Sequence, residues 1–293
     1  MLVSVIASRW LCKRSAERCE NRLGGCYIGP AMATVRPAAV AGMFYPDRPA
    51  ELASVVEGLL SAAPADGRPA PKAVIVPHAG YLYSGPIAGS AFRTLAAAAG
   101  TITRVILLGP AHFVPIRGLA LPGDQRFSTP LGEIRIEPEG CQASLRLPQV
   151  RVIPEAHARE HSLEVELPFL QRLLGEFDLV PLVVGQASGE EIAEVLDRLW
   201  GGPETLVVIS SDLSHYLPYE GAQRADRETA DEILALGGPL HSRQACGAAP
   251  VNGLLTVARR RGMTAELLDL RNSADTAGDP SRVVGYGAFA FYG

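Results

Sequence analysis

The chain has 293 residues, of which 47% are hydrophobic and 20% charged, as in an ordinary globular protein able to bury a sizeable core. The net charge of −4 argues against broad binding to a nucleic-acid backbone. No apolar run reaches the roughly 18 residues needed to span a bilayer, so we expect neither a nucleic-acid nor a membrane partner.

The N-terminal segment differs from the rest of the chain. Residues 1–10 have the apolar character of a signal peptide, but no basic region precedes them and charged residues follow at once. The sequence from Met32 onwards reads as an ordinary cytoplasmic start. We therefore expect residues 1–31 to be an extension outside the native fold, and residues 32–293 to form one domain. Peptides from upstream of Met32 in the native protein would contradict this expectation.

From Val35 onwards, apolar runs alternate with amphipathic stretches, which predicts a single α/β domain with a largely parallel or mixed sheet flanked by helices. No repeat or linker divides it. The elements expected in chain order are helix 50–62, strand 72–77, helix 86–98, strand 104–108, hairpin 127–136, helix 162–174, strand 179–184, helix 189–200, strand 206–210, helices 225–236 and 251–261, and strands 265–270 and 282–292.

Three of the predicted strands are each followed by a short segment that contains a histidine: His78, His112 and His215. The carboxyl ends of parallel strands share one edge of a sheet, and ligands bind there. The spacing of His78 and His112 leaves room for one strand–helix–strand unit, so their strands could be neighbours. A single histidine in such a place usually caps a loop. Three at equivalent positions favour a shared metal or proton-transfer site, because imidazole is the commonest metal ligand.

The five cysteines form no CxxC pair, so neither a zinc ribbon nor a redox dithiol is indicated, and we expect reduced thiols in a cytoplasmic protein. Cys246 lies just before a helix that we expect to begin near Pro250. A helix N-terminus favours the thiolate, which is a good ligand or nucleophile. A small buried apolar residue is an equal alternative for this cysteine.

The remaining polar candidates are less specific. His161 and Glu164 are three residues apart at the start of a predicted helix, where they could present two ligands, or a cap and a surface carboxylate. His157 and His241 lie in polar loop sequence and are expected to be solvated. The serines beside Asp212 and His215 invite a hydrolase interpretation, but no GxSxG elbow occurs.

The order of several short motifs resembles that of the Memo family over residues 35–292. These motifs are Val35-Arg36-Pro37, Gly42-Met43-Phe44-Tyr45, Pro77-His78-Ala79-Gly80-Tyr81, Tyr83-Ser84-Gly85, Leu108-Gly109-Pro110-Ala111-His112, Thr129-Pro130-Leu131-Gly132, His161-Ser162-Leu163-Glu164, Ser210-Ser211-Asp212-Leu213-Ser214-His215 and Cys246-Gly247. Each is weak alone, whereas their shared order is specific.

The resemblance implies a fold akin to class III extradiol dioxygenases and a mononuclear metal site. His78, His112 and Cys246 match the family's ligands. The other matched residues are expected along the same cleft: Asp212 and His215 in a catalytic role, and His161, Tyr81 and Ser211 as lining.

The family has been linked to iron, copper and redox activity, and in animals to peptide binding. Prokaryotic members resemble one component of a system with a radical-SAM protein and an AMMECR-type protein. Ser214 and Tyr216 stand where animal members carry cysteine and tryptophan, which weakens transfer of the peptide-binding role.

Three hypotheses for the function follow. The first is an oxidoreductase with Fe(II) or copper, in which His215, oriented by Asp212, moves protons. The second is a non-catalytic metal- or peptide-binding adaptor or chaperone that acts with radical-SAM and AMMECR-type partners. The third is a zinc hydrolase. We do not expect catechol cleavage from the fold alone. Extradiol enzymes use a carboxylate as the third metal ligand, whereas Cys246 would supply a softer thiolate.

Overall fold

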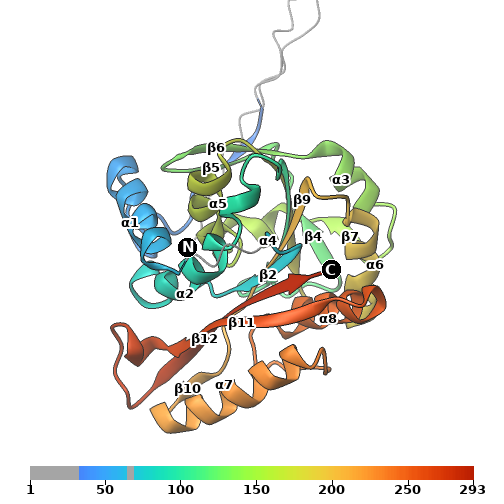
Figure 1. The fold of residues 1–293 in the computed structure, drawn as a ribbon. Helices are drawn as coiled ribbons and strands as arrows, with labels where there is room; N and C mark the ends of the chain where they lie inside the picture. The colour runs from blue at the N-terminus through green and yellow to red at the C-terminus, as the bar shows by residue number, and fades with distance from the viewer. Residues whose placement is uncertain (1–32, 65–68) are drawn as a thin grey trace, which may run out of the picture. The chain divides into compact units, whose positions relative to one another are not determined.

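The computed structural model describes residues 33–64 and 69–293, and they form a mixed β-sheet covered by helices on both faces (Figure 1). The expected α/β class is confirmed. The extension expected at residues 1–31 lies outside the described residues. No helix among those described is long and apolar enough to cross a membrane.

The sheet of the described residues has 12 strands, and its main path runs β1-β5-β6-β8-β3-β9-β2-β12-β10. The strands are β1 (Val35–Arg36), β2 (Ala73–Val76), β3 (Arg104–Pro110), β4 (Leu119–Leu121), β5 (Arg126–Thr129), β6 (Gly132–Ile136), β7 (Val150–Val152), β8 (Asp178–Val184), β9 (Thr205–Ser210), β10 (His215–Leu217), β11 (Thr264–Asn272) and β12 (Val283–Tyr292). Strands β8, β3, β9 and β2 are parallel, and β12 runs antiparallel to β2.

The four parallel strands are almost entirely buried apolar residues, as expected of strands covered on both faces. The strands predicted at 72–77, 104–108, 179–184 and 206–210 are confirmed. The order of the strands differs from the expectation, because β9 lies between β2 and β3. His78 and His112 therefore follow strands that are not neighbours.

Two hydrophobic cores pack against the two faces of the sheet. One contains α1 (Pro49–Ala62), α2 (Tyr81–Arg93) and α5 (Leu167–Leu174), with Phe92 stacked on Phe169 at 5.0 Å between ring centroids. The other contains α6 (Gly189–Leu199), α7 (Tyr219–Leu234) and α8 (Ala248–Arg261). The remaining helices are short: η1 (Ala96–Ala98), α3 (Pro138–Ser144), α4 (Pro154–Ala158), η2 (Glu164–Glu166) and η3 (Ser273–Asp275).

Two helices that contain a proline differ from their expected boundaries. The helix expected to begin at Pro86 begins at Tyr81, because Gly80 O accepts from Tyr83 N and Ser84 N and so forms the first turn earlier. The helix expected over 162–174 is a 3₁₀ turn followed by α5, which places Pro168 in the first turn, where proline is tolerated.

Candidate metal centre

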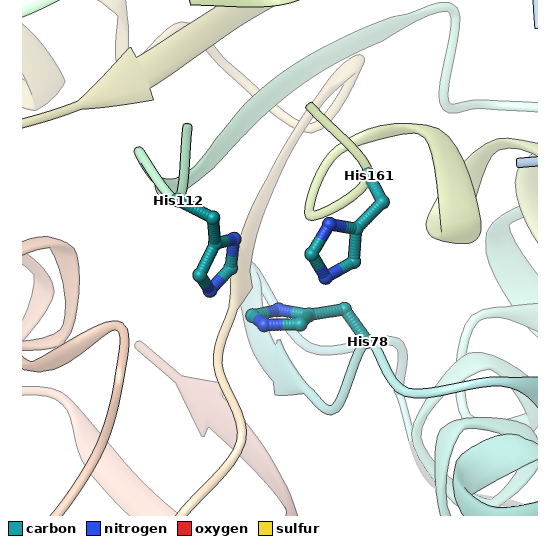
Figure 2. A group of neighbouring side chains, drawn as sticks. All are labelled: His78, His112 and His161. Atoms are coloured by element: carbon teal, nitrogen blue, oxygen red, sulfur yellow. The ribbon is translucent and has the colours of Figure 1, made fainter. Parts of the chain in front are cut away.

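Three imidazoles meet at the carboxyl edge of the parallel strands. His78 follows β2, His112 follows β3, and His161 lies just before η2, and their candidate ligand atoms all lie within 4.8 Å of one another (Figure 2). The ring centroids of His112 and His161 are 4.6 Å apart and nearly parallel. His78 stands edge-on to both rings, at 5.2 and 5.5 Å.

Strand β9, which separates β2 from β3, ends in small and acidic residues and leaves room for the rings. Ser210 Oγ lies 2.7 Å from His78 Nδ1, and the amide of His78 donates to Asp212 Oδ1 at 2.9 Å. The His78 ring is buried, and burial, reinforced by His112 and His161, lowers its pKa well below the usual value. His78 is therefore neutral, which is the form that can offer a nitrogen lone pair to a metal.

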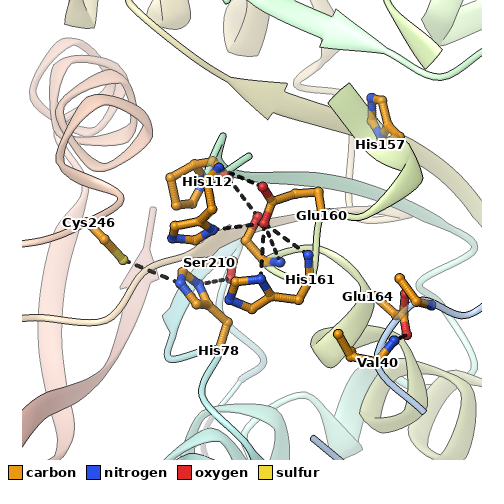
Figure 3. A network of polar contacts seen from close by, with 12 residues as sticks. Val40, His78, His112, His157, Glu160, His161, Glu164, Ser210 and Cys246 are labelled. Carbon is orange, nitrogen blue, oxygen red and sulfur yellow. Dashed lines mark hydrogen bonds and ion pairs between the residues drawn. The ribbon is translucent and has the colours of Figure 1, made fainter. Parts of the chain in front are cut away.

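Glu160 holds the other two histidine segments (Figure 3). Its carboxylate accepts from His112 Nδ1 at 2.8 Å and from His112 N at 2.7 Å. It also accepts from the amides of His161 and Ser162, both at 2.9 Å. Burial alone would raise the pKa of Glu160, but the hydrogen bonds from His112 and the amides outweigh it and lower the pKa to about 2. A carboxylate on Nδ1 orients a histidine so that Nε2 faces a metal.

Replacing Glu160 with glutamine is expected to weaken metal binding roughly 10- to 100-fold, the usual cost of losing a partner that orients a ligand. Both carboxylate oxygens accept N–H groups, so the amide NH₂ would face another donor. Equilibrium dialysis with Zn²⁺ measures the change, and the exposed Glu139→Gln serves as control. Equal affinity in the two variants would show that Glu160 does not orient the site.

His161 belongs to the cluster, but Glu164 does not. Burial and the nearby His112 lower the pKa of His161 to about 4, so this ring is also neutral. Glu164 is fully buried away from the rings and accepts from Arg36, the amides of Ala39 and Val40, and Tyr45 Oη. Glu164 is therefore neither a second ligand beside His161 nor a surface carboxylate.

Cys246 lies beside His78, with Sγ 3.3 Å from Nε2. The amide of Asp212 points to the same sulfur at 3.3 Å. Burial and the charge of Asp212 raise the pKa of the thiol to about 12, so the position before α8 does not by itself produce the expected thiolate. A bound cation would favour the thiolate, because thiol ligands lose their proton on metal binding.

Asp212 and His215 do not form the expected pair. His215 is exposed, and its Nδ1 contacts Leu213 O at 2.8 Å, so this carbonyl orients the ring. The partial loss of water around the ring and the charge of His112 lower the pKa of His215. Asp212 instead supports His78, and burial raises its pKa to about 7, which suits proton exchange near neutral pH.

Tyr81 and Ser211 are buried and engage the backbone. Tyr81 Oη donates to Val165 O at 2.7 Å, and Ser211 Oγ accepts from the amide of Gly247 at 2.9 Å. They support the segments that carry His161 and Cys246. His157 is also buried, with Nε2 2.9 Å from Ala120 O, so the expectation of a solvated ring is wrong; His241 is exposed, as expected.

Sequence reasoning missed Glu160 and the arginine that anchors its segment. Arg36 donates to Glu160 O at 2.6 Å and to His157 O at 2.8 Å. The only local signal was the acidic residue directly before His161, and nothing in the sequence connected that residue with His112.

A family model described as Memo-like protein matches residues 36–290. A MEMO1 family protein of Methanopyrus kandleri is 36% identical over 283 residues, covering 87% of this chain and 98% of that protein. One from Aquifex aeolicus is 36% identical over 265 residues, covering 86% and 97%. The crystal structure of an uncharacterized protein from Escherichia coli K12 superposes with a TM-score of 0.50 at 14% identity, covering 75% of this chain and 99% of that one. This last likeness concerns the fold alone.

Proposed function

This chain belongs to the Memo family, and we propose that it binds one transition-metal ion between His78, His112 and Cys246, with His161 as a further nitrogen donor. The observation that carries the proposal is the convergence of three imidazoles whose candidate ligand atoms lie within 4.8 Å of one another. In two of these rings Nδ1 is hydrogen-bonded to a neighbouring side chain: His78 to Ser210 and His112 to Glu160. These bonds leave Nε2 of each ring for an ion.

The donor set fits Fe(II) or copper, which we propose as the native metal. Imidazole suits iron, copper and zinc, and a thiolate draws the preference towards softer ions such as Cu(I) and zinc. A bound Fe(II) or copper ion would supply one-electron redox chemistry at this edge of the sheet. We propose an oxidoreductase on this basis, located in the cytoplasm, where Cys246 would stay reduced.

The protein's own residues would bind the substrate and move its protons. A groove of about 740 Å³ reaches Cys246 and is lined on its other sides by Ala111, Ile116 and Pro250, which gives a small molecule access to the sulfur side of the site. His215 is exposed near His112. A positive charge on one of these rings repels a positive charge on the other, which lowers the pKa of His215. A proton held at His215 would therefore be readily given up when the site gains positive charge.

Metal analysis of anaerobically purified protein, followed by oxygen-uptake measurements with small phenols and thiols, tests the proposal. Iron or copper at about one ion per chain with oxygen uptake is the expected result. His215→Ala should keep the metal and lower the uptake, because the ring contacts Leu213 O rather than a ligand. Bound metal with no uptake for any compound would contradict the oxidoreductase but not the metal site. Zinc with hydrolysis of an ester would favour a hydrolase.

One observation favours the adaptor as a second candidate function. Of the large hydrophobic side chains that are exposed in the described part of the chain, five follow within a few residues of His78, His112 or His215: Leu82, Tyr83, Phe113, Tyr216 and Leu217. Exposed apolar side chains beside a site suit a protein partner, and we propose radical-SAM and AMMECR-type proteins as candidates. Leu82→Ser should weaken capture of such a partner and Val152→Ser should not. Equal capture by both variants would contradict the adaptor surface.

A further inference from the structure

A buried carboxylic acid, Glu166, is connected to His78 through one serine. Ser210 Oγ lies 3.1 Å from Glu166 Oε1 and 2.7 Å from His78 Nδ1. All three side chains are buried. We call these three side chains the Glu166 relay. Its far end is His78 Nε2, the nitrogen that lies 3.3 Å from Cys246 Sγ and faces the candidate metal site (Figure 3).

The hydrogen of a neutral Glu166 has one favourable position. Within the described residues, Oε2 of this carboxyl is buried without a hydrogen-bond partner. A hydrogen placed there would have no acceptor, whereas a hydrogen on Oε1 can be donated to Ser210 Oγ. Burial, opposed by the Ser210 hydrogen bond, raises the pKa of Glu166 well above its usual value, which favours the neutral acid in the metal-free chain.

The protonation state of Glu166 then sets the tautomer of His78. When Glu166 donates to Ser210, the serine hydroxyl must donate its own hydrogen to His78 Nδ1. The ring hydrogen is then on Nε2, facing Cys246, and it occupies the lone pair that a metal needs. When Glu166 is ionised, the relay reverses: Nδ1 donates to the serine, the serine donates to the carboxylate, and Nε2 is free.

We propose that Glu166 is a positioning residue that couples metal binding at His78 to the release of one proton; this inference rests on the metal site proposed above. As the ion takes the Nε2 lone pair, the Nε2 hydrogen leaves to solvent. The Glu166 hydrogen moves to Ser210 Oγ and the serine hydrogen moves to Nδ1. Glu166 is left as a carboxylate, so the relay loses one proton and its atoms balance.

Two other titratable side chains face Glu166 from neighbouring elements. Tyr81 on α2 has its pKa raised well above the usual value by burial and by Glu166, so it stays neutral. Asp212, after β9, raises the pKa of Glu166 and hydrogen-bonds the amide of His78. Asp212 is unchanged in every variant below, and Ser210→Ala also keeps Glu166, so a proton released by Asp212 alone would still be counted in that variant.

Calorimetric titration of the full chain with Zn²⁺, in two buffers of different ionisation enthalpy at about pH 7, counts the released protons. Glu166→Gln, which is neutral and of equal size, is expected to release about one proton fewer than the wild type. Its Zn²⁺ affinity should also rise less steeply with pH, by about tenfold less per pH unit. The exposed Glu155→Gln is the matched control and should behave as the wild type.

Ser210→Ala provides a second variant, because it breaks the relay without changing Glu166. It should also release about one proton fewer, and the double variant should release no fewer than either single variant. Equal proton counts in the wild type and in Glu166→Gln, or an unchanged count in Ser210→Ala, would overturn the relay while leaving the metal site intact. A wild-type chain that binds no Zn²⁺ would overturn the proposed metal site and the relay with it.

Discussion

Replacing His78 with alanine is expected to reduce bound metal to near background, a loss of more than about 100-fold in affinity, since removal of a ligand should exceed the roughly 10- to 100-fold cost of removing its partner. His78 is the one ring that contacts both neighbours and the sulfur of Cys246. Its pKa is well below the usual value, so the ring is neutral before an ion binds. Metal content after dialysis against Zn²⁺ gives the measurement, with the exposed His241→Ala as control.

His112→Ala should also reduce bound metal to near background. Glu160 hydrogen-bonds Nδ1 of His112, and this bond orients Nε2 of the ring towards the metal site. Cys246→Ala is also expected to reduce bound metal to near background, as the family resemblance implies. His161→Ala separates two coordination patterns: near-background metal would make it a required ligand, whereas a smaller loss would make it an auxiliary donor. Unchanged metal in both His78→Ala and His112→Ala would refute the site.

The second large effect is on stability. Glu164→Ala is expected to lower the free energy of unfolding by about 3–5 kcal/mol, the usual cost of breaking a buried ion pair from one side. Arg36 and Glu164 are 3% and 0% exposed and lie 2.6 Å apart. The variant also leaves the amides of Ala39 and Val40 without their carboxylate acceptor. Urea denaturation measures the difference.

The matched control is Glu133→Ala, which breaks the exposed ion pair with Arg126 at 3.6 Å. Exposed pairs contribute roughly 0–1 kcal/mol, so this variant should unfold close to the wild type. Because Arg36 also holds the carbonyls of His157 and Glu160, Glu164→Ala should weaken Zn²⁺ binding as well. Similar losses of stability in the two variants would mean that the buried pair has no special role.

The sequence alone determined the elements and the edge of the sheet at which the chemistry lies. A short, fully apolar run is buried on both faces whatever its neighbours are, so β2, β3, β8 and β9 could be predicted from composition. Because parallel strands point the same way, His78 and His112 had to share one edge of the sheet. The sequence left open whether their strands are neighbours, and the structure places β9 between them.

Only the tertiary structure decided which polar groups meet at that edge and in what state of protonation. Glu160 reaches His112 across 48 residues, Glu164 reaches Arg36 across 128, and Cys246 reaches His78 across 168. No local pattern encodes such pairings. The pKa of a thiol or carboxyl depends on how much water the whole fold removes from it. For this reason Cys246, for which a thiolate at a helix start and a small buried residue were equal alternatives, is a half-buried thiol, and Glu166, expected only as a helical residue, is a buried acid behind a candidate ligand.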